Sequence, residues 1–154
     1  MSALALIRPH SWDLPLILHV LGGMVSVGAL SLCLLSLAGA WRTGSEALTR
    51  LGFRALLWGA IPGFVVLRGA AQWIAHKEGL DNDNVDLTWL NIGFTVTDAG
   101  VLLLIAATIL GGLAVRRSSR GEGAGASARV ATVLVSILLV AYLVAVWAMT
   151  AKPT

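Results

Sequence analysis

The feature that most constrains this chain is a set of four long apolar stretches separated by short polar connections. They run over about residues 14–40, 51–75, 90–115 and 130–151, and each exceeds the ~20 residues that a helix needs to cross a bilayer. Of the 154 residues, 57% are hydrophobic and 12% are charged, against about 25% charged in ordinary soluble domains. The sequence therefore predicts an all-α fold, a four-helix bundle integral to the membrane in a single domain, and excludes a water-soluble globule.

The charges of the connections predict the orientation of this bundle. Residues 42–54 carry three arginines, and residues 116–129, which read as a flexible basic loop, carry four. Residues 77–89 carry one lysine and four acids. Positively charged short loops stay in the cytoplasm, so we expect a multipass protein of the cell (inner) membrane with both termini on the non-cytoplasmic side. The net charge of +3 arises mainly from these loops and gives no reason to expect a nucleic-acid partner.

Two charged residues lie well inside the apolar stretches, away from their ends. Arg68 lies within the second stretch, and Asp98 in the third is the only acid inside any of them. An unpaired guanidinium at membrane depth costs at least ~2.5–3.5 kcal/mol on insertion scales. We therefore expect an Arg68–Asp98 intramembrane pair that joins the second and third helices.

Other polar residues fall at a similar depth. With ~1.5 Å rise per residue, Arg68 and Asp98 each lie about 7 Å outward of the middle of their helices. His19 is expected slightly further outward, level with Gln72 and Thr95, and Tyr142 slightly deeper. The predicted ligand site is a polar cluster in the outer half of the bundle, made of His19, Arg68, Gln72, Thr95, Asp98 and Tyr142.

Small residues predict where the helices approach closely. The first stretch carries small or polar residues at alternating steps of three and four, among them Gly22 and Ser26. The second carries Gly59 and Gly63 on either side of Pro62. Small side chains let helix backbones pack closely in lipid, and Pro62 is expected to kink the second helix.

The roles of the polar residues remain open on the sequence alone. The Arg68–Asp98 pair is either a structural pin that fixes helix register, or a gate, proton relay or anion site. His19 is either a hydrogen-bonded histidine at a helix interface or an axial haem ligand, with Gly22 and Ser26 leaving room for a flat macrocycle. No second haem ligand is well placed, because His76 lies nearer the surface and His10 lies outside the helix.

The stretch Leu18-His19-Val20-Leu21-Gly22 has the form L-H-x-x-G. It resembles the opening of an early helix in several families of small bacterial integral membrane proteins, including the copper-resistance-D type and the HemJ type. In the HemJ type this histidine is associated with haem, so the resemblance implies haem binding by His19. It covers about ten residues, and the later helices carry no motif of these families.

No catalytic nucleophile and no metal-binding motif is recognisable, which favours a role other than catalysis without deciding it. We expect a protein that binds a partner or small ligand within the bundle. The alternatives are a haem-binding redox protein that uses His19 and an oligomeric small transporter or channel that uses Arg68 and Asp98. The expected partners are the lipid bilayer and either further copies of the chain or a larger membrane complex.

Overall fold

The computed structural model describes residues 13–79, 88–123 and 125–151, and these residues form helices joined by short turns, without any strand. The helices are α1 (Asp13–Thr43), α2 (Glu46–Ala55), the π-helical turn η3 (Leu56–Ala60), α3 (Ile61–Glu78), α4 (Thr88–Ser119) and α5 (Gly125–Ala151). Because α2, η3 and α3 follow one another without a break, they form one helix of 33 residues. The described residues thus contain four helices long and apolar enough to cross a membrane, in agreement with the predicted all-α, four-helix architecture.

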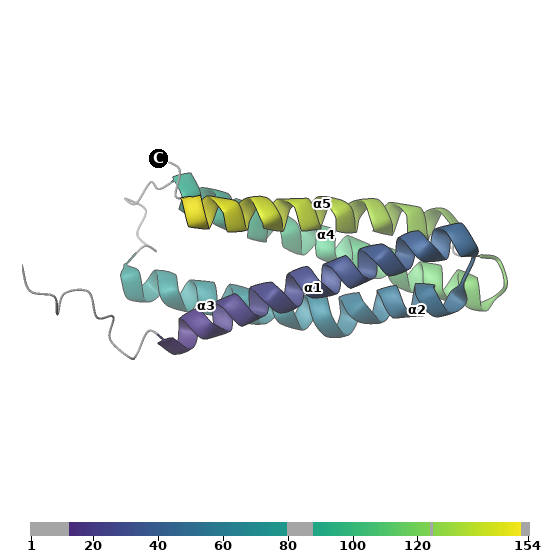
Figure 1. Ribbon diagram of the computed structural model, residues 1–154, viewed down its shortest axis with the longest axis horizontal. Helices are drawn as coiled ribbons and strands as arrows, with labels where there is room; N and C mark the ends of the chain where they lie inside the picture. Colours follow the sequence, from purple (N-terminus) through teal and green to yellow (C-terminus); the bar gives the residue numbers. More distant parts are fainter. Residues whose placement is uncertain (1–12, 80–87, 124, 152–154) are drawn as a thin grey trace, which may run out of the picture.

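The helices run alternately up and down the bundle (Figure 1). Helix α1 packs along α2, η3 and α3, while α4 packs along α5, and α1 also contacts α5. Helix α1 begins and α5 ends at the same end of the bundle, which we call the terminal end (Figure 1). The opposite end carries the turns from α1 to α2 and from α4 to α5, and we call it the arginine-rich end.

The interior is built from small and medium-sized side chains, and large apolar side chains cover the outside. Leu30, Leu56 and Val135 are fully buried, whereas Leu35 is 72% and Leu102 68% exposed. In water such outward leucines would form a large apolar surface, but hydrocarbon solvates them at no cost. This distribution fits a bundle surrounded by lipid.

Helices α1 and α3 approach so closely that no side chain fits between them at two positions. A Cβ atom on Gly22 would lie 2.6 Å from the backbone nitrogen of Leu67. A Cβ atom on Gly63 would lie 2.7 Å from Oγ of Ser26. The close approach predicted from these small residues is therefore confirmed.

Pro62 coincides with an interruption of the regular helix. The π-helical turn η3 ends at Ala60, two residues before Pro62, and the N–H of Ile61 donates to the carbonyl of Leu56, five residues earlier. Proline has no N–H to donate and its ring clashes with the carbonyl four residues earlier. A wider turn just before Pro62 relieves that clash, so the expected disturbance at this position takes the form of a π turn.

The connections at the arginine-rich end are shorter than the sequence suggested. Helix α2 begins at Glu46, where Oγ of Ser45 accepts a hydrogen bond from the N–H of Leu48 at 3.4 Å. Helix α4 continues to Ser119, and α5 starts at Gly125. Most of the predicted connections 42–54 and 116–129 are thus helical, because apolar patterning marks only the lipid-embedded part of a helix, while caps and charges extend it into water.

Candidate functional site

A salt bridge links α3 to α4 at the predicted position. Nη2 of Arg68 lies 2.8 Å from Oδ1 of Asp98. The same guanidinium lies over the ring of Phe94, with Cζ 5.1 Å from the ring centroid. Phe94 and Asp98 are four residues apart and share one face of α4, so Arg68 lies across that face. The predicted Arg68–Asp98 pairing is therefore present.

The two ends of this salt bridge differ in exposure. The Arg68 side chain is 27% exposed and the Asp98 side chain 64%. Within the described residues, α3 packs chiefly on α1, and α4 packs chiefly on α5. The salt bridge therefore connects two helices that pack little against each other. The carboxylate therefore lies at the surface of the bundle and not in its core.

The guanidinium has hydrogen-bonding capacity left over. Nη1 of Arg68 is buried and has no hydrogen-bond partner among the residues that the structure describes. A guanidinium carries five N–H donors and is charged at every physiological pH. Within the described part of the chain, the pair therefore leaves one buried nitrogen of Arg68 without a hydrogen-bond partner and much of the Asp98 side chain exposed.

Gln72 and Thr95 extend the polar surface around the salt bridge. Both are exposed; Gln72 lies one helical turn after Arg68 on α3, and Thr95 lies one turn before Asp98 on α4. Both turns lead toward the terminal end of the bundle. We call the surface formed by Arg68, Gln72, Thr95 and Asp98 the α3–α4 polar face.

His19 lies at the interface of α1 and α3, behind this face. Its Nδ1 atom lies 3.3 Å from the carbonyl oxygen of Leu67, the residue before Arg68. Since a carbonyl oxygen can only accept, Nδ1 carries the proton in this contact. His19 thus bonds the backbone next to Arg68, as an interface histidine does.

The space expected for a haem beside His19 is filled. The α3 backbone occupies the position next to Gly22, and Ser26 packs directly against Gly63. A flat macrocycle cannot lie against these residues in this packing. The space that the sequence suggested beside Gly22 and Ser26 is taken up by the contact between α1 and α3. His76 offers no second ligand nearby, because it lies nine residues beyond Leu67, about 13 Å along α3.

Tyr142 faces a different part of the bundle. It is 6% exposed and belongs to the core, with its hydroxyl 3.5 Å from the point where a Cβ atom of Gly100 would lie. Gly100 follows Asp98 by two residues, roughly 200° around α4. The hydroxyl has no hydrogen-bond partner among the described residues, and the structure does not bring it to the α3–α4 polar face.

Sequence reasoning missed Phe94 as a neighbour of the salt bridge. The signal that could have found it is its position one turn before Asp98 on the same face of the helix. In the part of the chain that the structure describes, no group of three or more His, Cys, Asp or Glu side chains could hold a metal ion.

Comparisons with protein-family models, with curated proteins and with solved structures yield no match to this chain.

Proposed function

We propose that this chain is a small multipass protein of the cell membrane that binds a partner or a small polar ligand at the α3–α4 polar face. The observation that carries the proposal is the 64% exposure of the Asp98 side chain within an apolar helix. One carboxylate oxygen accepts from Arg68, and the remaining acceptor sites of the carboxylate can take N–H or O–H donors.

Lipid alone is a poor neighbour for this face. Acyl chains offer no hydrogen-bond donors, and ionisable residues inside membrane helices face a protein interface or a water-filled cavity. Polar side chains on membrane helices form hydrogen bonds to neighbouring helices. The polar face accordingly fits a helix of another protein, a second copy of the chain, or a small ligand carrying both donors and acceptors.

The surroundings of the salt bridge favour binding over a purely structural role. If the salt bridge only fixed the relative positions of α3 and α4, we would expect both charged groups to be buried between tightly packed helices. Here α3 and α4 pack little against each other in the described residues, and Gln72 and Thr95 continue the polar surface without being needed for the pair.

The test is the accessibility of a thiol introduced at Thr95. The variant Thr95→Cys, with Cys33→Ala to remove the single native cysteine, is reconstituted in liposomes and treated with a charged maleimide on both sides. The control is Leu102→Cys, because Leu102 is 68% exposed and lies seven residues further along the same side of α4. The same two variants are also labelled in native membranes.

We expect Thr95→Cys to react in liposomes and Leu102→Cys to resist, because charged reagents require water around the thiol. Protection of Thr95→Cys in native membranes would identify a protein partner, whereas reaction in both settings would identify a site for a small ligand. Equal resistance of both thiols in liposomes would mean that lipid covers the face, and would contradict the proposal.

A further inference from the structure

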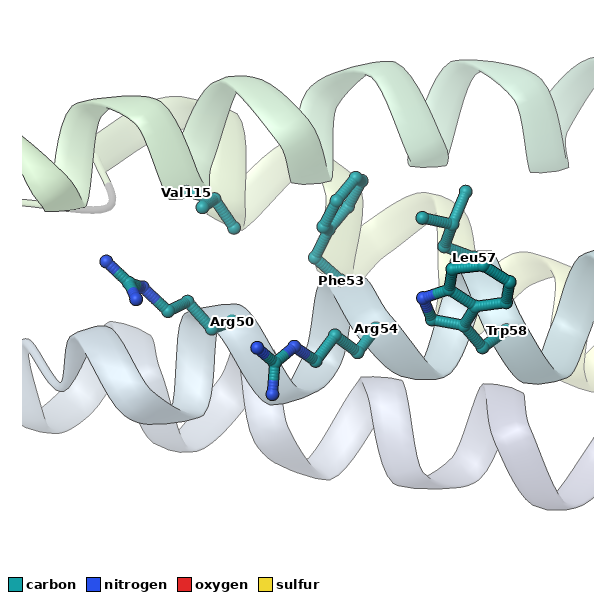
Figure 2. A pocket seen from close by; sticks show the side chains of 6 residues that line it. All are labelled: Arg50, Phe53, Arg54, Leu57, Trp58 and Val115. Carbon is teal, nitrogen blue, oxygen red and sulfur yellow. The ribbon is translucent and has the colours of Figure 1, made fainter.

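A groove lies between α2–η3 and α4 near the arginine-rich end of the bundle. It consists of two adjoining hollows of about 290 Å³ and 460 Å³, which share Phe53 and Val115 as lining residues. Figure 2 shows the smaller hollow, with Phe53 extending from α2 toward α4 and the side chains of Arg50 and Arg54 beside it. Arg116 lines the larger hollow from the side of α4.

Two glycines on α4 make room for the ring of Phe53. The ring of Phe53 lies 3.4 Å from the point where a Cβ atom of Gly111 would be, and 3.5 Å from the corresponding point at Gly112. The ring therefore lies directly against the α4 backbone. This contact joins α2 and α4 where the two hollows meet, since Phe53 lines both.

The charged groups of the groove are only partly neutralised. Arg50 pairs with Glu46 at 2.5 Å. Arg54 and Arg116, both exposed, form no ion pair within the described residues. The segments 42–54 and 116–129 together hold seven arginines against two glutamates. The groove thus carries two unpaired guanidinium groups in a strongly cationic region.

The groove changes from charged to apolar along the helix axis. Trp58 lies one turn beyond Arg54, about 6 Å deeper into the bundle, and its side chain is 76% exposed. On α4, Leu113 and Ile109 follow the same order inward from Arg116, and Ile109 is 60% exposed. Figure 2 shows this order on α2, with both guanidinium groups toward one end of the hollow and the Trp58 ring at the other.

We propose that this groove binds an anionic phospholipid of the surrounding membrane. Its phosphate binds at the arginine-bearing end of the groove, where Arg54 lines the smaller hollow and Arg116 the larger. One acyl chain follows the apolar surface of Leu57, Ile109 and Leu113. Guanidinium groups bind phosphate through directed, charge-assisted hydrogen bonds, and basic pockets between membrane helices bind anionic headgroups. The site lies at the opposite end of the bundle from the α3–α4 polar face and does not depend on it.

The apolar part of the groove favours a phospholipid over a free phosphate as the ligand. A water-soluble phosphate compound would use only the arginine end and would leave Leu57, Trp58 and Ile109 without a role. A phospholipid matches both parts, because its charge and its chains are arranged in the same order along the membrane normal. It is also present at high concentration wherever this protein is folded.

The experiment is native mass spectrometry of the purified full chain in detergent, titrated separately with phosphatidylglycerol and phosphatidylcholine of identical chains. We expect phosphatidylglycerol to be retained preferentially, and Arg54→Gln or Arg116→Gln to lower its apparent affinity by about fivefold, the effect of one interfacial charge. The matched control is Arg42→Gln, which removes an exposed arginine at the same end but outside the groove. Helical circular dichroism verifies that each variant is folded.

Three results would overturn the proposal. The first is equal retention of the two lipids. The second is an equal loss of phosphatidylglycerol in Arg42→Gln and Arg54→Gln, which would indicate attraction by the overall charge without a site. The third is displacement of phosphatidylglycerol by inorganic phosphate at matching concentration, which would identify a phosphate site that makes no use of the acyl chains. Retention that survives inorganic phosphate and is weakened only by the groove variants supports it.

Discussion

The salt bridge between Arg68 on α3 and Asp98 on α4, at 2.8 Å, connects two helices that pack mainly on other neighbours. Its basic partner is anchored more deeply, with the guanidinium over Phe94 and Nη1 buried. Its acidic partner is largely exposed. An ion pair arranged in this way links α3 to α4 and at the same time presents a carboxylate on the surface of the bundle.

The close contact of α1 and α3 predicts a sharp difference between two glycines of α1. Gly22→Ala should destabilise the bundle by about 1–3 kcal/mol, because the new methyl group would overlap the α3 backbone. Gly28→Ala is the matched control, since a Cβ atom there meets nothing within 4 Å. Reversible unfolding in mixed detergent micelles measures both variants. Equal stability of the two would show that α1 and α3 do not cross at Gly22.

The buried hydroxyl of Tyr142 predicts that its removal has little effect on the stability of the bundle. Because this hydroxyl has no hydrogen-bond partner among the described residues, Tyr142→Phe should leave stability unchanged or raise it by up to about 1 kcal/mol. Tyr142→Ala should be strongly destabilising, because it removes a ring from the core. A large loss of stability in Tyr142→Phe would show instead that the hydroxyl is satisfied within the folded protein.

The environment of His19 predicts the outcome of a haem test. We expect purified protein, expressed with haem supplied, to show no Soret band, because the space beside Gly22 and Ser26 is filled by α3. A visible absorption spectrum before and after dithionite provides the measurement. A Soret band that shifts on reduction and disappears in His19→Ala would contradict this expectation and restore the haem interpretation that the L-H-x-x-G resemblance implies.

The fold could be predicted from the sequence because lipid imposes simple constraints on a chain. Apolar length marked all four helices. One arginine, Arg68, and one acid, Asp98, lie well inside apolar stretches, so each was the expected partner of the other. The small residues Gly22 and Gly63 marked positions where helices approach closely, because small side chains let backbones pack together in lipid, but they did not say which two helices meet there.

Other features depend on rotations and distances that apolar patterning does not encode. A similar depth placed Tyr142 with Arg68, but depth does not give the rotation of a residue about the helix axis, and Tyr142 faces the core. The room inferred beside His19 is occupied by α3, because a small side chain signals close packing as readily as an empty space. The groove at Arg54 and Arg116 combines residues from helices that lie side by side only in the folded bundle.

The most direct test of the central claim is a double-mutant cycle for Arg68 and Asp98, measured by reversible unfolding in micelles. Asp98→Asn and Arg68→Gln should each destabilise the bundle, because each leaves one charged side chain without its partner. With Arg68→Gln added to Asp98→Asn, stability should recover, giving a coupling free energy of about 1–3 kcal/mol. Strictly additive losses would show that the two side chains do not interact in the folded protein and would contradict the account.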